Sequence, residues 1–338
     1  MKKLSLFLVS LSLLLSACSV GNITKKEEVI QENTKEKSVI PKYSISGDYY
    51  RTIIPLKEQK MINSVNVQTN SKLDINEFET GLMNIALKQF DTKNHYLQRN
   101  QYIPEKTIKE IVTKQEIPLV SNIIEHDYFT KKNSEELSLA GIVIGLAIPS
   151  NYSNEEALSK GNEVANQLLK AIHDNKDFTK TPITFAIFKQ ENMTSLKSGT
   201  FISNVTVPKN ESKVGSWSNI KEESFVYPSE EFQKAKEADY KMLDKFANEV
   251  KKFSPKDYIP INAKISYNND HINKLNIDTI IKYNGKSEIT AFTQVITQNM
   301  LDVLPKDIKI QIQIKSDDGI EAIIIKEKNE DKPFVSFT

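Results

Sequence analysis

Residues 308–314, IKIQIQI, alternate strictly between isoleucine and a polar side chain. A period of two residues is typical of a β-strand that buries one face and leaves the other in water. Asp318-Gly319 follows and suits a tight hairpin turn into a further strand at residues 320–327. The alternation therefore predicts paired antiparallel strands with one wet face in this part of the chain.

Two other stretches have a different apolar pattern. Residues 139–148, LAGIVIGLAI, and residues 183–188, ITFAIF, are nearly continuous apolar runs. Strands that are buried on both faces have this composition, because neither of their alternating rows of side chains meets water. We therefore expect interior strands at these two positions.

Helices are predicted by apolar spacing behind N-terminal capping signals. Asp74 with Glu77, and Ser153 with Glu156, have the spacing of a capping box, in which each side chain bonds the backbone of the other residue. Apolar side chains then recur every three or four residues, which is typical of a helix packed on a core. The helices are expected at residues 74–90, 155–173, 229–252 and 288–304.

The order of these elements occurs twice along the chain. Each half contains a helix, then a strand, a helix and two strands, without close residue identity between the halves. Such a repeated order predicts a diverged internal duplication. The expected fold class is α+β, with two related repeat units, each an antiparallel or mixed sheet packed with helices. The expected strands are 139–148, 183–189 and 200–207 in the first unit, and 274–284, 308–315 and 320–327 in the second.

The N-terminal segment has the organisation of a lipoprotein signal peptide. Two lysines precede an apolar core at residues 4–15, which is too short for a spanning helix of about 20 residues. Cys18 is the only cysteine, and it follows a Leu-Ser-Ala run of the kind that a lipoprotein signal peptidase reads. We expect cleavage of residues 1–17 and lipid such as palmitate on Cys18, which would anchor the protein to the extracytoplasmic face of the cell membrane. The alternative is an ordinary secretory peptide followed by a chance cysteine.

A charged segment separates Cys18 from the expected folded body. Nine of the nineteen residues from Thr24 to Lys42 are charged, and none is aromatic. This composition is typical of disordered chain, so residues 18–43 are expected to form a disordered tether that holds the body off the membrane.

The two repeat units are expected to meet in a polar, turn-prone stretch at residues 208–216. This junction places the first unit at residues 44–210 and the second at residues 211–338. The single tryptophan, Trp217, lies beside the junction and is expected to pack between the units.

Composition argues against several classes of function. The 45 basic and 44 acidic residues nearly cancel, and no basic run or glycine-rich phosphate loop occurs, so nucleic acid is not an expected partner. The four histidines form no metal-binding pair, and no Gly-x-Ser-x-Gly elbow is present. One cysteine leaves no disulfide, paired-thiolate site or Cys-x-x-Cys redox pair. We expect no cofactor, no metal and no enzymatic activity.

A candidate surface site lies at residues 46–51, where the tether would meet the fold. Asp48, Tyr49, Tyr50 and Arg51 combine a carboxylate, two aromatic rings and a guanidinium beside a permissive glycine. Tyrosine and arginine are enriched in binding hot spots, and such side chains stack on sugars and peptides. The alternative is structural, with a tyrosine closing the core while Asp48 and Arg51 form an ion pair.

Five separate stretches are similar to one protein family. The chain resembles the CamS family of sex-pheromone lipoproteins of Gram-positive bacteria at SGDYYR (46–51), DINEFETGLM (74–83), TPITFAIFKQ (181–190), FVYPS (225–229) and KSEITAFTQ (286–294). The resemblance extends over most of the chain. It implies a lipoprotein with a repeated domain, whose signal peptide can be processed to a short hydrophobic peptide that induces plasmid transfer in neighbouring cells.

The resemblance leaves alternatives open for the signal peptide and for the mature domain. The peptide at the pheromone position is LSLLLSA, residues 11–17, which lacks the Ala-Ile-Phe-Ile start of the active family peptide, and the alternative is a signal remnant that is degraded. The mature domain is expected to bind a peptide, a wall component or a protein partner without catalysis. The alternative is a solute-binding or cell-wall-acting lipoprotein, for which we expect two lobes linked by hinges around a deep cleft.

Overall fold

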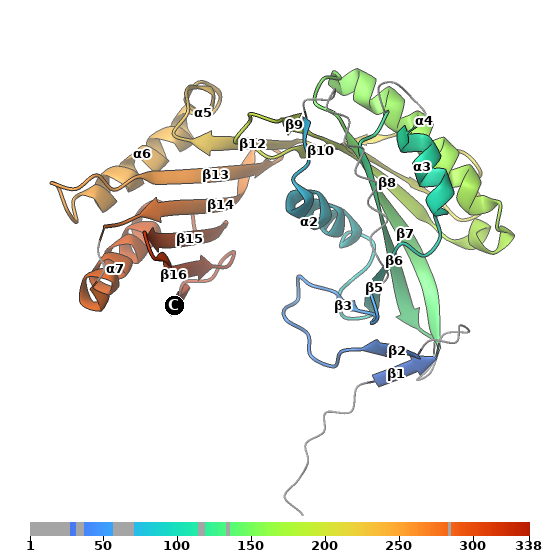
Figure 1. Cartoon of the computed structure of the whole chain (residues 1–338), viewed down its shortest axis with the longest axis horizontal. Coiled ribbons are helices and arrows are strands. Elements are labelled where there is room, and N and C mark those ends of the chain that lie inside the picture. Colours follow the sequence, from blue (N-terminus) through green and yellow to red (C-terminus); the bar gives the residue numbers. More distant parts are fainter. Residues whose placement is uncertain (1–27, 32–36, 57–70, 114–118, 133–135, 283–284) are drawn as a thin grey trace, which may run out of the picture.

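The computed structural model describes residues 28–31, 37–56, 71–113, 119–132, 136–282 and 285–338. Two sheets with their helices form two units that lie side by side and are joined at one end (Figure 1). The strands of the first sheet all precede those of the second along the chain. Each unit is therefore built from one continuous stretch of sequence.

The first sheet has seven strands in the order β11-β10-β8-β7-β6-β5-β3. At its centre, β7 pairs antiparallel with β6 and parallel with β8, and α4 makes the crossover from β7 to β8. The strands are β3 Arg51–Thr52, β5 His95–Arg99, β6 Asn122–Lys131, β7 Leu137–Ile148, β8 Ile183–Lys189, β10 Thr200–Val207 and β11 Ser218–Asn219. The helices of this unit are α2 Ile75–Ala86, α3 Glu105–Thr113 and α4 Asn154–His173, and a small ladder pairs β4 Ser71–Lys72 with β9 Glu191–Asn192.

The second sheet has six strands, β12 to β17, in their order along the chain. Here β14 pairs antiparallel with β13 and parallel with β15, and α7 makes the crossover. The elements are β12 Glu222–Tyr227, α5 Glu230–Ala235, α6 Glu237–Lys251, β13 Ile261–Asn268, β14 His271–Ile280, α7 Lys286–Val303, β15 Lys309–Ser316, β16 Gly319–Lys326 and β17 Phe334–Phe337.

The two units share one topology. In the first, the hairpin β6–β7 is followed by α4, the parallel strand β8 and the antiparallel strand β10. In the second, β13–β14, α7, β15 and β16 follow with the same pairings in the same spatial order. This agreement confirms the predicted α+β fold of two related units.

The first sheet is covered on both faces. Side chains of β7 alternate between two cores: Ile142 and Ile144 pack with α4, whereas Val143 packs with α2. On the second face α2 lies very close to β7. A Cβ placed on Gly145 of β7 would lie 2.6 Å from the ring of Phe78 on α2. The apolar runs at 139–148 and 183–188 are therefore interior strands, as predicted, with neither row of side chains in water.

The second sheet is covered on one face only. Helices α6 and α7 pack together on that face around a single core that includes Phe246, Phe292 and Ile312. The other row of β15 is Lys309, Gln311, Gln313 and Lys315, and it is partly exposed. The wet face predicted from residues 308–314 is present.

The predicted disordered tether is wrong over part of its length. Strand β1, Glu28–Gln31, pairs antiparallel with β2, Lys37–Ile40. The fully buried Ile40 packs in a small core with Ile53, and Val39 bridges Ile54 through two backbone hydrogen bonds of 2.8 Å. Ile40 supplies an apolar contact that the net composition of the charged stretch conceals.

The chain changes sheet later than predicted. Strand β11 still pairs with β10 of the first sheet, and β12 opens the second sheet at Glu222, so the change falls after Asn219 rather than at residue 210. Trp217 consequently packs on the first unit rather than between the units. Its indole Nε1 donates to Oδ1 of Asn162 on α4 at 3.1 Å.

Candidate functional site

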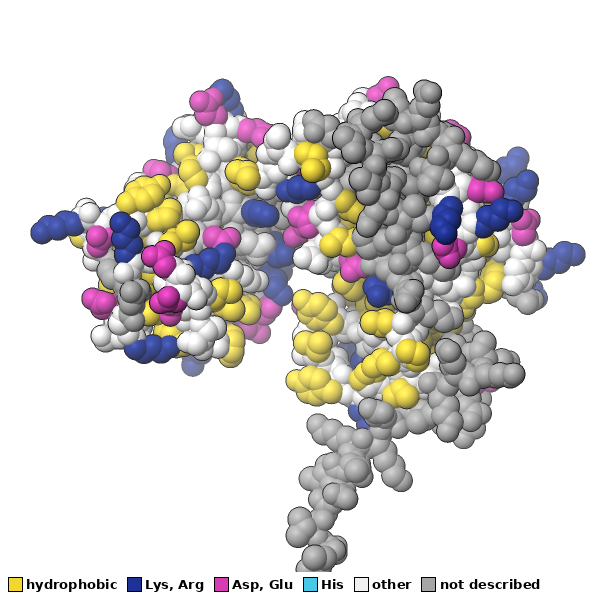
Figure 2. All heavy atoms as spheres, in the orientation of Figure 1, with side chains coloured by type: hydrophobic (Ala, Val, Ile, Leu, Met, Phe, Trp, Pro, Cys, Tyr) yellow, Lys and Arg dark blue, Asp and Glu magenta, His cyan; other side chains and the backbone are white. Residues whose placement is uncertain are grey.

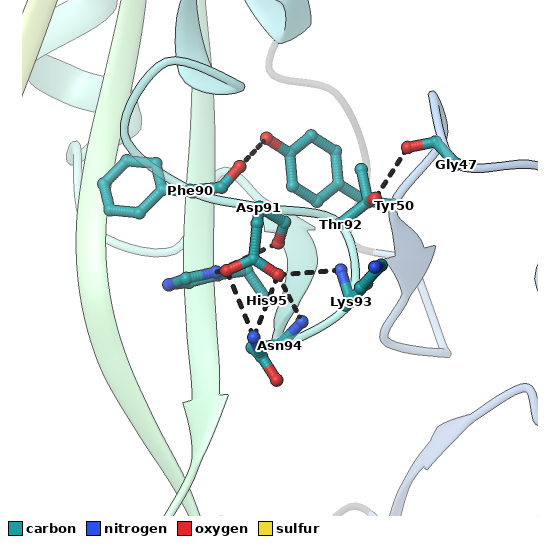
Figure 3. Close-up of polar contacts among 8 residues, drawn as sticks. All are labelled: Gly47, Tyr50, Phe90, Asp91, Thr92, Lys93, Asn94 and His95. Carbon is teal, nitrogen blue, oxygen red and sulfur yellow. Dashed lines mark hydrogen bonds and ion pairs between the residues drawn. The ribbon is translucent and has the colours of Figure 1, made fainter.

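One of the four residues predicted as a surface site, Tyr50, holds the fold together (Figure 3). Tyr50 is buried, and its hydroxyl donates to the carbonyl of Phe90 at 2.6 Å. Burial raises the pKa of the Tyr50 phenol far above its ordinary value, with a further contribution from the Asp91 carboxylate. Tyr50 therefore stays neutral and closes the core beneath its loop.

The other members of the predicted site point elsewhere. Arg51 lies over the ring of Tyr96, 4.8 Å from its centre, and donates to its hydroxyl at 3.1 Å. Asp48 and Tyr49 are exposed, and no ion pair between Asp48 and Arg51 is present in the described part of the chain. The four residues thus do not converge on one ligand position. Cys18 and residues 11–17 lie outside the described residues.

A cleft of about 290 Å³ lies where the two units meet. One wall is α2 with the neighbouring ends of β8 and β10, and the other wall is formed by β12, β13 and β14. Helix α2 is held in place by Asp74, whose side chain accepts from the backbone N–H of Glu77 and from the hydroxyl of Ser198. The cleft is therefore built from both units.

Glu222 is a half-buried carboxylate of the cleft. It stands at the start of β12, and its Oε2 accepts from the backbone N–H of Phe201 on β10 at 3.0 Å. Burial raises the pKa of Glu222 to about 6, against the hydrogen bond from Phe201. The charge of Lys88 also opposes the rise, and the nearby carboxylate of Glu77 adds to it. A cation placed in the cleft would favour ionisation of Glu222.

The remaining charges of the lining are paired. Lys274 of β14 reaches Oε1 of Glu77 on α2 at 3.7 Å, which links the second unit to the first. Glu223 pairs with Lys236 at 2.7 Å. Three carboxylates and one ammonium group line the cleft, so its charge is negative when Glu222 is ionised.

The rest of the lining is mainly neutral and polar. Ser224 and Ser266 stand opposite each other on β12 and β13. Five side chains of the lining make no hydrogen bond to any residue in the described ranges, and they offer hydroxyl and amide groups to a ligand. They are Thr80, Asn84, Ser224, Ser266 and Asn273.

The open face of the second sheet continues from the cleft. Ser266 and Lys274 line the cleft and are neighbours across β13 and β14. The same row reaches Lys309 on β15, and the next row pairs Asn276 with Gln311. The cleft therefore opens onto a polar β-surface.

Comparisons with known proteins decide the family. The family model of the CamS sex pheromone cAM373 precursor matches residues 57–118 and 113–332. The chain belongs to the CamS family. No curated protein matches this sequence.

Solved structures agree with the CamS assignment. The crystal structure of a sex pheromone staph-cAM373 precursor is 58% identical, covers 84% of this chain and 99% of its own, and superposes with a TM-score of 0.53. A sex pheromone precursor from Lactobacillus salivarius is 25% identical, covers 87% and 97%, and reaches 0.74. The C-terminal domain of the staph-cAM373 precursor from Staphylococcus aureus is 23% identical, covers 78% and 96%, and reaches 0.66, which shows a shared fold.

A buried polar run on β6 is the other notable set of ionisable groups in this CamS-family chain. Glu125 accepts from the backbone N–H groups of Tyr102 and Ile103 at 2.6 and 2.9 Å, so it holds the segment before α3. Burial lowers the pKa of His126 to about 4, and the Arg99 charge adds to this. No group of three potential metal ligands, and no helix long and apolar enough to cross a membrane, occurs among the described residues.

Sequence reasoning missed the cleft because its walls are distant in the sequence. Glu77 and Glu222 are separated by 145 positions, and the only motif that includes either residue, the capping box at Glu77, is a signal for a helix start. Two signals pointed toward this region without defining it. The duplication implied a junction between units, and the wet face of residues 308–314 implied a sheet surface without a helix.

Proposed function

We propose that this CamS-family protein is a lipid-anchored surface lipoprotein whose mature part binds a polar ligand bearing an amine, without catalysis. Suitable ligands are an amino sugar of the cell wall or the free amino end of a peptide. The observation that carries the proposal is Glu222, a half-buried carboxylate with a raised pKa in a cleft between the two units. The anchoring and the binding are separate claims with separate tests.

Anchoring through Cys18 rests on the sequence. A signal-peptide core precedes the only cysteine of the chain, and a diacylated cysteine holds a protein on a bilayer far more firmly than one acyl chain. Metabolic labelling with palmitate should mark the wild-type protein and leave Cys18→Ala unlabelled. A Cys18→Ala protein that stays at the membrane would contradict the anchor.

Ligand binding rests on the charge and polarity of the cleft. Burial and Glu77 disfavour the charged form of Glu222, so an ammonium group would be attracted by both carboxylates and would restore ionisation. The unbonded hydroxyls of Ser224 and Ser266 are available to the neutral part of the ligand. A charged hydrogen bond of this kind contributes about 1.5–3 kcal/mol, or roughly tenfold or more in affinity.

The test compares glucosamine with N-acetylglucosamine in calorimetric titrations of the mature protein. The two sugars have the same ring, and only the first carries a free ammonium group. We expect binding of glucosamine that weakens about tenfold in Glu222→Gln and less in the control Glu321→Gln on the second sheet, outside the cleft lining. Tri-alanine and its N-acetyl form repeat the comparison for peptides. Equal affinities for the free and acetylated forms would rule out recognition of an amine.

The signal peptide is a second possible source of function. The family is described as a sex pheromone precursor, which supports LSLLLSA, residues 11–17, as a secreted signal. Synthetic LSLLLSA added to plasmid-bearing recipient cells should raise clumping and plasmid transfer. If LSLLLSA causes no clumping or transfer while an active control peptide does, the segment is not a pheromone for that recipient.

The solute-binding alternative is not favoured by the strand order. The chain enters the second sheet once, after Asn219, and does not return to the first sheet within the described residues. Lobes that close by hinges are expected to be joined by several crossing segments. We therefore propose binding at the cell surface rather than delivery to a transporter.

A further inference from the structure

A cluster of exposed apolar side chains occurs on the loop between β2 and β3 and directly after β3. Tyr43 and Ile45 are 73% and 76% exposed, and Tyr49 and Ile54 are 47% and 45% exposed. Isolated exposed apolar residues are ordinary, whereas several within one short segment mark a surface that meets a partner. Figure 2 shows hydrophobic side chains gathered at this end of the first unit, where Figure 1 places β1, β2 and β3. We call Tyr43, Ile45, Tyr49 and Ile54 the loop patch.

The loop patch is held in place rather than left loose. Thr92 donates its hydroxyl to the carbonyl of Gly47 at 2.6 Å, and Tyr50 donates to Phe90 at 2.6 Å (Figure 3). Within the loop, the backbone N–H of Asp48 donates to the hydroxyl of Ser46 at 3.2 Å. These bonds fix the loop at its base, so Tyr43, Ile45 and Tyr49 are presented outward by an ordered backbone.

The position of the loop patch points to a lipid surface. Glu28, the first residue of β1, lies ten residues after Cys18, and ten residues span at most about 35 Å when fully extended. Strand β1 pairs with β2, which leads directly into the loop. The chain length between the lipid and the fold therefore limits how far the loop patch can lie from the bilayer. Tyrosine is enriched at membrane interfaces, because its ring is apolar and its hydroxyl is polar.

We propose that the loop patch docks on the bilayer surface and orients the protein there. The proposal rests on the lipid anchor at Cys18, which brings the patch within reach. It replaces the expectation of a body that is held off the membrane. The occupant of the patch is the lipid interface, with the rings of Tyr43 and Tyr49 at the headgroup level.

The experiment places a fluorescent reporter in the loop patch of the lipidated full-length protein. Trp217→Phe removes the only native indole, and Tyr49→Trp then reports from the patch. Tyr258→Trp is the matched control, because Tyr258 is 80% exposed on the second unit. Each protein is reconstituted in vesicles of phosphatidylcholine and phosphatidylglycerol with and without brominated acyl chains. Mass spectrometry of the reconstituted protein establishes the lipid on Cys18.

We expect about a twofold loss of Tyr49→Trp fluorescence in brominated vesicles, as for an indole at the interface, and no loss for Tyr258→Trp. A lipidated protein in which neither reporter is quenched, or both are quenched equally, would overturn the docking and leave the anchor standing. A protein without lipid on Cys18 would overturn the anchor and the docking with it.

A second pair of variants separates the bilayer from a second copy of the chain. Tyr43→Ser with Ile45→Ser removes the most exposed side chains of the patch, and Met193→Ser with Leu196→Ser removes exposed apolar side chains elsewhere on the first unit. Only the first pair should abolish quenching of Tyr49→Trp. If the detergent-solubilised protein instead forms dimers that only the patch variant dissociates, the patch is an interface between copies and the proposal is wrong.

Discussion

The two sheets of this protein repeat one topology but differ in the face that points away from the crossover helix. In β7 this row of side chains is small or apolar and lies under α2, whereas in β14 of the second unit three of its four side chains are polar and the row is partly or fully exposed. Helix α2 can approach β7 because glycine and alanine leave room beneath it. The rows are Gly141, Val143, Gly145 and Ala147 in β7, and Lys274, Asn276, Asp278 and Ile280 in β14.

This difference shows how one duplicated motif supplies two kinds of surface. The first unit uses its extra helix to bury a second core, and the same helix forms one wall of the cleft. The second unit keeps a polar face, and Lys274 on that face reaches Glu77 on α2. The fully covered sheet is a scaffold, and the half-covered sheet provides the surface that continues into the cleft.

The largest expected effect comes from placing a carboxylate on the second face of each sheet. Val143→Asp buries an unpaired charge under α2 and should lower the free energy of unfolding by about 3–5 kcal/mol. Gln311→Asp on the open face of β15 should change it by less than about 1 kcal/mol. Urea unfolding of the two variants gives the comparison directly. Similar losses would mean that the second sheet is covered in solution.

Acid should weaken the first unit through His126. Its folded pKa of about 4 lies below the ordinary 6.5, so the unfolded state binds more protons between these values and stability falls as the pH falls through this window. The full shift corresponds to a loss of about 3 kcal/mol. Arg99 on β5 and Glu79 on α2 line the same small cavity as His126. Hydrogen exchange across this pH window should show the loss in the first sheet, and His126→Gln should remove most of it.

The close approach of α2 is tested by adding one methyl group. Gly145→Ala would bring a Cβ to 2.6 Å from the Phe78 ring, and overpacking of this kind costs about 1–3 kcal/mol. Asn276→Ala is the counterpart on the second sheet and also removes a buried Oδ1 that lacks a hydrogen-bond partner, so its cost should stay below about 0.5 kcal/mol. Thermal unfolding of both variants distinguishes a packed second face from an open one. A larger loss for Asn276→Ala would reverse the comparison.

The smallest expected effect has the opposite pH dependence. The pKa of Glu222 is raised from 4.5 to about 6, so the folded state binds more protons in this window and stability falls as the pH rises through it. Glu222→Gln keeps an acceptor for the N–H of Phe201 and should be more stable than the wild type above pH 6, by about 1 kcal/mol. Denaturant titrations at several pH values measure this gain. If Glu222→Gln is less stable than the wild type at every pH, the role of Glu222 is purely structural.

Much of the fold could be predicted where a single local signal dominates. The alternation at residues 308–314 predicts the wet face, and the predicted capping box of Ser153 and Glu156 is present with both of its hydrogen bonds. Where tertiary contacts decide, prediction fails. Strand β6 carries Glu125-His126-Asp127 and has no strand pattern, yet neighbouring elements bury all three residues.

Other features of the fold have weak sequence signals. The helix expected at residues 229–252 is two helices, because Lys236 leaves the helical conformation between α5 and α6. Asp74 caps α2, but the predicted capping box is only half formed, because the Glu77 side chain pairs with Lys274. This helix also ends at Ala86 rather than residue 90. The cleft depends on how two units meet, which no periodicity within either unit can specify.

Recognition of an amine by the cleft is tested by titrating Glu222 with NMR of carboxyl-labelled glutamate. The mature protein is titrated with and without glucosamine, and Glu222→Gln assigns the signal. We expect a pKa of about 6 for Glu222 in the free protein and a lower value with the amine bound, because an ammonium group favours the carboxylate. A Glu222 that titrates at its ordinary value, or a raised pKa that glucosamine leaves unchanged, would contradict an amine-binding cleft.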